Sequence, residues 1–304
     1  MNLLENVRSK INCKLWEEFK TNNEDACKIH NFLSIISNSK ITFDHYALID
    51  IPGPNTGMDN LFQVYSCLGY LSQGRERLIE KQNRFMWLAE CTALGKQAIE
   101  APPQVVISDF VLSEFPDEIR KIVLKYSELT PELNIELFQK LCGKTFLGDE
   151  TAAQELVKIT CDYLNKDWPL LTLKEYNTVN EFNELLSWAL VFGRVPNHYT
   201  FNISLLNAFD SLSNFVEYFQ KNLNIELNIS PSIIKGSKND LLEQCSTKGK
   251  LIKTQLIDGE VIVPSAFIEF TWRYPLVQNP EKWEEYFTGF VTNNANHVIE
   301  SVYL

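Results

Sequence analysis

The spacing of apolar residues predicts a helical start to the chain, followed by a strand. Over residues 3–37 apolar side chains, among them Leu15 and Phe19, recur at steps of three and four, which is the period of an amphipathic helix. The segment 41–51 has the character of a strand and ends at Pro52-Gly53-Pro54, a strong turn signal.

The rest of the chain changes repeatedly between helical and strand patterns. The predicted elements are a helix over about 58–69 with Gly69 as its C-terminal cap, short strands over 75–110 (most clearly 104–110), helices over 115–192, a strand at 197–204, a helix over about 206–221, and turns with strands in the remainder (most clearly 261–272).

One short pattern occurs twice. DHYALIDI at 44–51 and NHYTFNIS at 197–204 each begin with an acidic or amide residue, a histidine and a tyrosine. Each is followed by an amphipathic helix and then by several short strands. This echo indicates two modules that each open with a histidine-bearing strand, with the helices of 115–192 inserted between them.

Charge and cysteine content narrow the class of protein. Twenty-eight Lys+Arg and 39 Asp+Glu give a net charge of −11, so nucleic acid and membrane are not expected as partners. Seven scattered cysteines without a CxxC motif exclude zinc ribbons and thioredoxin-like sites. The first residues, MNLLENVRSKINCK, lack the apolar core of a signal peptide, so we expect a cytoplasmic location. The sequence does not indicate protein partners.

Two of the four histidines stand near the starts of predicted strands. Because side chains alternate along a strand, His45 shares one face with Ala47 and Ile49, and His198 shares one with Thr200. Two such faces can converge on a common cavity. The other interpretation is a pair of core histidines whose hydrogen bonds are satisfied locally.

Glu269 is a third candidate, because it interrupts the apolar run AFIEFTW. A buried carboxylate is costly unless it is paired or bound to a metal. Arg273 lies on the same strand face, roughly 13 Å away at ~3.3 Å per residue. A metal held by His45 and His198 would be a nearer partner. Two histidines and one carboxylate with open positions are typical of non-haem Fe(II) oxygenases.

With these motifs the chain resembles the 2-oxoadipate dioxygenase/decarboxylase (hydroxyglutarate synthase) family, which is vicinal-oxygen-chelate-like in fold. The resemblance covers nearly the whole chain. The matching motifs are LWEEF near residue 16, DHYAL at 44–48, LGYLSQG at 68–74, NHYTFNIS at 197–204, IKGSKNDLLEQCST at 234–247, FIEFTWRYP at 267–275 and GFVTNNANHVIES at 289–301.

The resemblance implies that His45, His198 and Glu269 bind Fe(II), with Zn or Mn as alternatives in the isolated protein. It also implies small-molecule partners, a 2-oxo acid and O2. In the family's reaction the metal chelates the oxo acid, oxygen attacks, CO2 leaves and a hydroxylated acid results. With 2-oxoadipate the product is 2-hydroxyglutarate, a step in lysine degradation.

One position departs from the family pattern DHxAxR, in which the arginine grips a substrate carboxylate. Here that position is Ile49, on the face of His45. We assign substrate contact to Ile49, Thr200 and Arg273. The last is the retained arginine of the EFxxR motif, and we also assign it a catalytic role; its alternative role is to pair with a local acid. The cations available to replace the missing arginine are Arg75, Arg77, Arg194 and Arg273.

We therefore predict an α+β fold in a single domain, residues 1–304. Modules 41–110 and 197–304 form a curved sheet around a metal cavity, covered by N-terminal helices and the insertion 115–192. The predicted function is Fe(II)- and O2-dependent oxidative decarboxylation of a 2-oxo dicarboxylic acid. Because of Ile49, two alternatives stay open: a metal-dependent enzyme of the same fold with a different substrate, and a non-catalytic metal-binding homologue.

Overall fold

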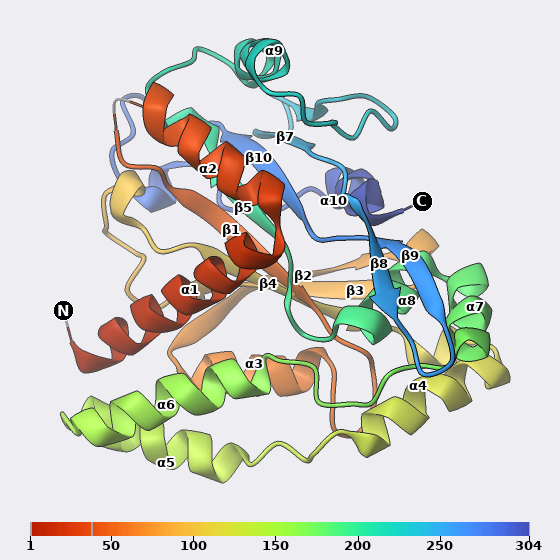
Figure 1. Ribbon diagram of the computed structural model, residues 1–304. Coiled ribbons are helices and arrows are strands. Elements are labelled where there is room, and N and C mark those ends of the chain that lie inside the picture. Colours follow the sequence, from red (N-terminus) through yellow and green to blue (C-terminus); the bar gives the residue numbers. More distant parts are fainter. Residues whose placement is uncertain (1, 38, 304) are drawn as a thin grey trace.

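A curled sheet of eight strands forms the centre of the molecule, with a separate two-stranded hairpin beside it (Figure 1). The computed structural model describes residues 2–37 and 39–303. In chain order the strands are β1 (Phe43–Ile49), β2 (Tyr70–Leu78), β3 (Asn83–Glu90), β4 (Gln104–Phe110), β5 (Pro196–Asn202), β6 (Lys235–Ser237), β7 (Leu242–Ser246), β8 (Leu251–Gln255), β9 (Glu260–Pro264) and β10 (Phe267–Arg273).

Helices cover both faces of this sheet (Figure 1). They are α1 (Leu3–Asn22), α2 (Glu24–Ile36), α3 (Met58–Cys67), α4 (Asp117–Leu129), α5 (Ile135–Phe146), α6 (Glu150–Tyr163), α7 (Leu173–Phe182), α8 (Glu184–Phe192), α9 (Leu212–Asn222) and α10 (Thr292–Val298). Helices α4–α8 are the helical insertion that the sequence predicted. None of the helices in the described residues is long and apolar enough to cross a membrane.

The strand order β2-β3-β4-β1-β5-β10-β7-β6 repeats one arrangement twice. β1 pairs in parallel with β4, and β5 pairs in parallel with β10. At the centre β1 and β5 run antiparallel, so the two halves meet at a seam with approximate twofold symmetry. The predicted α+β fold, with two strand-rich modules in a curved sheet, is confirmed, and one sheet runs through both modules.

Alternation along the two central strands directs side chains into two cores. Tyr46 and Leu48 of β1 and Tyr199 and Phe201 of β5 pack with α1, α2, α3, α5, α6 and α9. On the other face Ile49 packs with residues from α4, α7, α8 and α10. The periodicity of the strands therefore separates a filled apolar face from the face that carries the cavity described below.

The helix predicted over residues 3–37 is two helices, because Asn23 ends the first and begins the second. The backbone of Asn23 is extended, and its side chain accepts a hydrogen bond from the Ala26 N–H, which caps α2. Its Nδ2 atom donates to the Ala266 carbonyl at 2.7 Å. Apolar spacing is helical on both sides of this break, so the pattern alone did not reveal it.

The C-terminal part also differs from the predicted pattern. The strand expected at 261–272 is divided between β9, which pairs with β8, and β10, which enters the main sheet. The residues of α10, expected among turns and strands, form a short helix. Its sequence, TNNANHV, is largely polar, so its position against the sheet is set by tertiary contacts and not by an apolar period.

We expect Phe201→Ala to lower the free energy of unfolding by about 3–5 kcal/mol, because truncating a buried aromatic side chain leaves a cavity. Phe201 is fully buried, and its ring stacks on Phe43 with centroids 4.9 Å apart. Denaturant unfolding followed by circular dichroism measures the loss. The control is Leu147→Ala, at a side chain that is 85% exposed. Equal losses in the two variants would contradict the described core.

Candidate metal centre

An extra residue interrupts the β1–β5 pairing immediately before each strand histidine. The paired residues are Phe43 with Phe201, His45 with Thr200, Tyr46 with Tyr199, Ala47 with His198 and Leu48 with Pro196. This register leaves Asp44 and Asn197 as bulged residues. A β-bulge re-aims a side chain, so each of these residues can reach the ring of the histidine that follows it.

Each bulged residue holds the neighbouring imidazole by its Nδ1 atom. Asp44 Oδ1 lies 2.8 Å from His45 Nδ1, and Asn197 Oδ1 lies 3.0 Å from His198 Nδ1. Both oxygens are acceptors, so each neutral ring carries its proton on Nδ1 and keeps the Nε2 lone pair for another partner. This is how imidazole ligands of metals are commonly oriented.

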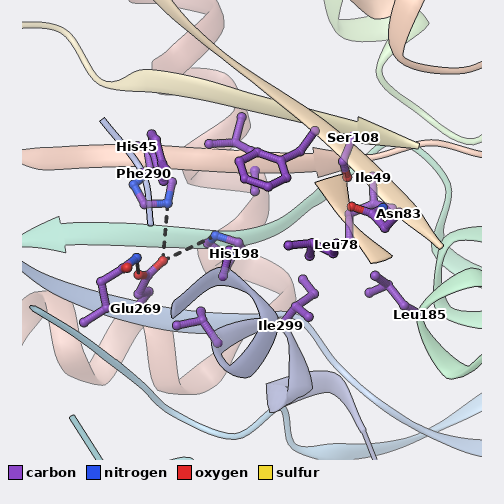
Figure 2. Close-up of a pocket in the computed structure, with 16 residues that line it drawn as sticks. His45, Ile49, Leu78, Asn83, Ser108, Leu185, His198, Glu269, Phe290 and Ile299 are labelled. Atoms are coloured by element: carbon purple, nitrogen blue, oxygen red, sulfur yellow. Dashed lines mark hydrogen bonds and ion pairs between the residues drawn. The ribbon is translucent and has the colours of Figure 1, made fainter. Parts of the chain in front are cut away.

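Glu269 of β10 completes a cluster with the two Nε2 atoms (Figure 2). Its Oε2 atom lies 3.3 Å from His45 Nε2 and 3.4 Å from His198 Nε2. One ligand atom from each of the three residues lies within 4.8 Å of the other two. All three side chains are buried. The fold thus brings together the three residues that the sequence singled out as metal ligands.

Burial and neighbouring charges shift the pKa values of this cluster. Burial lowers the pKa of His198 to about 3, although Glu269 opposes the shift. Burial also disfavours charged His45, but the Glu269 and Asp44 carboxylates outweigh it and raise that pKa. Burial favours neutral Glu269, yet the imidazoles and the Thr200 hydroxyl lower its pKa. A neutral His198 and an ionised Glu269 are the forms that bind a cation.

Two neighbouring side chains hold the Glu269 carboxylate. Thr200 Oγ1 donates to Oε2 at 2.8 Å and lies 3.1 Å from His45 Nε2, and Gln244 donates to Oε1. Thr200 is not among the residues that line the cavity, and its assignment to substrate contact stays a prediction. The sequence analysis missed Gln244, although a polar residue in the buried strand β7 was an available signal.

Arg273 contacts Asp44 and the main chain instead of the cavity. Its Nε and Nη2 atoms donate to the two Asp44 oxygens at 2.5 and 2.8 Å. Its Nη1 atom donates to the Phe287 and Gly289 carbonyls, both at 2.8 Å. Arg273 is buried and is not among the residues that line the cavity; its assignment to substrate contact and catalysis stays a prediction. These contacts agree with its alternative role, which was to pair with a local acid. Through Asp44, Arg273 positions His45.

The Asp44 carboxylate stays ionised although it is buried. Burial favours its neutral form, but the charges of Arg273 and His45 hold its pKa well below its ordinary value. Asn202 adds a hydrogen bond to Oδ2 at 3.3 Å. The His45 ring is therefore held by the ionised Asp44 carboxylate, which is itself paired with the Arg273 guanidinium.

The metal-ligand cluster stands at one end of a cavity on the second face of the sheet. His45, Ala47 and Ile49 all line it, which confirms that they share a strand face. Phe290, just before α10, sets its ring edge against His45 with centroids 4.9 Å apart. The cavity has a volume of about 60 Å³, space for a few water molecules.

No lysine or arginine within residues 2–37 and 39–303 lines this cavity. Ile49 lies in the wall, where the family pattern has an arginine. Arg75 and Arg77 are exposed on β2. Arg194 is fully buried, where it contacts Asp167 and lies 3.8 Å from Asp50. None of the cations considered from the sequence therefore takes the place of the missing guanidinium.

The two symmetric halves of the sheet offer four equivalent positions for ligands, of which three carry a ligand atom. In the β5–β10 pairing Glu269 lies opposite Thr200, two residues after His198. In the β1–β4 pairing the equivalent position, opposite Ala47, is Val106. Val106 lines the cavity but offers no ligand atom. Two imidazoles and one carboxylate suit a divalent first-row ion and leave coordination positions for other ligands.

Comparisons with known proteins agree with this fold. A family model described as 2-oxoadipate dioxygenase/decarboxylase matches residues 13–293. The chloroplastic 2-oxoadipate dioxygenase/decarboxylase of Arabidopsis thaliana is 25% identical over 283 residues, which span 88% of this chain and 70% of that protein. The chloroplastic/amyloplastic protein of the same description from Oryza sativa subsp. japonica is 24% identical over 294 residues, spanning 93% and 75%.

A solved structure shares the architecture. The hydroxyglutarate synthase from Oryza sativa, crystallised in complex with 2-oxoadipate, superimposes with a TM-score of 0.76 at 20% sequence identity. The alignment covers 98% of this chain and 91% of that chain. The two proteins therefore have the same fold over nearly their whole lengths.

We expect Arg273→Met to lower the free energy of unfolding by about 3–5 kcal/mol, because it leaves the buried Asp44 charge unpaired. The double variant Asp44→Asn/Arg273→Met removes both charges and should recover most of this loss. Denaturant unfolding measures both, with Arg75→Met on the exposed side of β2 as the control. If the double variant loses as much as the single one, charge compensation is not the role of Arg273.

Proposed function

Because the chain belongs to the 2-oxoadipate dioxygenase/decarboxylase family, which is a family of enzymes, we propose that it decarboxylates a 2-oxo acid with O2 at a divalent metal ion. The ion would be held by His45, His198 and Glu269. The observation that carries this proposal is the convergence of these three side chains at one end of a largely apolar cavity.

Fe(II) is the ion that we propose, with Zn(II) and Mn(II) as ions that the same donor set accepts. When bound, Fe(II) supplies a centre at which a 2-oxo acid and O2 react. The donor set fits this role, since each imidazole is held at Nδ1 with its Nε2 facing Glu269. Val106, at the position equivalent to Glu269, adds no fourth ligand.

The surrounding residues would position the ligands and exclude water. Asp44 and Asn197 fix the planes of the two imidazoles, and Thr200 and Gln244 fix the carboxylate. Phe290 covers the edge of the cluster against the His45 ring. In such a largely apolar site a reactive intermediate would be protected from side reactions with water.

The proposed reaction is balanced with one O2 and one 2-oxo acid. The bond between carbons 1 and 2 breaks and carbon 1 leaves as CO2. One oxygen atom joins carbon 2, which becomes the new carboxylate, and the other hydroxylates carbon 3. The name of the family and the rice structure with 2-oxoadipate support a 2-oxo acid as substrate. A cytoplasmic location and a place in lysine degradation stay predictions.

We expect the purified protein to bind one Fe(II) per chain under anaerobic conditions. Removing a ligand atom should weaken binding by more than about 100-fold, beyond the effect typical of residues that only orient ligands. Metal analysis after gel filtration compares wild type with His45→Ala, His198→Ala and Glu269→Ala. His30→Ala is the control, because His30 lies on α2 against Trp16. Unchanged metal content in all three ligand variants would refute the site.

We expect the Fe(II)-loaded protein to consume O2 and release CO2 in equal amounts with at least one 2-oxo acid. An oxygen electrode and trapping of CO2 from an acid labelled at carbon 1 measure the two. Treatment with a chelator should abolish the activity, and Fe(II) should restore it. Metal binding without O2 consumption, across 2-oxo acids of different tail, would contradict the proposed reaction and favour a non-catalytic homologue.

A further inference from the structure

The cavity extends from the cluster along the first half of the sheet. His45 and Ile49 are four residues apart on β1, which corresponds to roughly 13 Å at ~3.3 Å per residue. At the far end Ile49 pairs with Ser108 of β4. Figure 2 shows Ile49, Asn83 and Ser108 together on the side away from Glu269. A molecule bound at the cluster would therefore direct its tail toward these residues.

The side of the cluster without a protein ligand faces the same way. Val106, the equivalent of Glu269 in the first half, lies two residues before Ser108 on the same face of β4. Both residues line the cavity. At the position where the symmetry of the sheet would place a fourth ligand, the first half therefore has the apolar Val106. The cavity continues from there toward Ile49.

The far end of the cavity is mainly apolar and has no cation. Beside Ile49, this end has Leu78, which pairs with Asn83, and Phe85, which pairs with Ser108. Leu185 lies on the same side in Figure 2, and Val298 and Ile299 also line the cavity. Within the described ranges the whole wall lacks lysine and arginine. A second carboxylate on the substrate tail would lose its hydration here without gaining an ionic partner, which strongly disfavours its binding.

One polar group at this end has no partner. Asn83 is 2% exposed and lines the cavity, and its Nδ2 atom makes no hydrogen bond with any described residue. An unpaired buried amide donor is unfavourable, and such groups usually have a partner in the functional complex. Ser108 Oγ already donates to the Leu48 carbonyl at 3.3 Å, so its oxygen is left as an acceptor.

We propose that the substrate is a 2-oxo acid with an uncharged tail, which carries a hydrogen-bond acceptor for Asn83 Nδ2. This inference rests on the proposed function and narrows its substrate class. It replaces the dicarboxylic acid expected from the family resemblance by an acid whose tail ends in an amide, ketone or hydroxyl group. Ile49 and Asn83 are then the residues that determine specificity.

Three acids with tails of equal length test this proposal. They are 2-oxoadipate, its 6-carboxamide, and 6-methyl-2-oxoheptanoate, in which an isopropyl group replaces the distal carboxylate. Calorimetry on the Zn(II)-loaded protein measures binding, and kcat/KM of the Fe(II)-loaded protein measures turnover. We expect the carboxamide to exceed 2-oxoadipate by about 10- to 100-fold in both, with the isopropyl acid between them. Equal or better binding and turnover of 2-oxoadipate would overturn the proposal.

Variants at the two specificity positions separate charge from hydrogen bonding. Asn83→Leu removes the donor at similar volume, so the carboxamide should lose its advantage over the isopropyl acid. Ile49→Arg supplies a guanidinium and should reverse the order in favour of 2-oxoadipate, whereas the matched control Ile49→Leu should keep it. If Ile49→Arg does not fold, Asn83→Leu still decides. An unchanged advantage of the carboxamide in Asn83→Leu would overturn the role of Asn83.

The same measurements distinguish the failure of this inference from that of the proposed function. Highest turnover with 2-oxoadipate would overturn the proposal of an uncharged substrate tail but would support the proposed oxidative decarboxylation. Preferred binding of the carboxamide, without O2 consumption with any of the acids, would support the tail site and contradict the proposed reaction.

Discussion

The pairing of Asp44 with both His45 and Arg273 is the interaction on which the rest of the site depends. A carboxylate in this position orients the imidazole, but its burial is tolerated only because a guanidinium compensates the charge. The same guanidinium binds two carbonyls of the segment before α10, which carries Phe290 to the His45 ring. Arg273 therefore stabilises both the orientation of the His45 ligand and the position of the wall segment that carries Phe290.

Local patterns were sufficient for most elements and for the three clustered residues. Alternation gave the face of His45, and an interrupted apolar run marked Glu269, because both signals depend only on burial along one strand. The role of Asp44 depends on a bulge, and a bulge is a property of two paired strands. Arg273 shares a strand face with Glu269, yet its partner comes from β1, far away in the chain. The periodicity of the sequence predicts neither the bulge at Asp44 nor the pairing of Arg273 with Asp44.

The two halves of the sheet have the same topology but different chemistry. The second half supplies His198 and Glu269, with Thr200 between them. In the first half Ala47 and Val106 occupy the positions equivalent to Thr200 and Glu269. The second half thus holds the carboxylate ligand and its hydrogen-bond partner at these positions, whereas the equivalent positions of the first half are apolar. The cavity therefore has a ligand end in the second half and an extension along the first half.

The antiparallel seam between β1 and β5 has a further consequence, since the three clustered residues come from both sides of it. Any change in the mutual twist of the halves would alter the spacing of the ligand atoms, whereas motion within one half would leave part of that spacing intact. Ions of different radius need different spacing. Discrimination between metals would then depend on the stiffness of a backbone ladder, in addition to the identity of the donors.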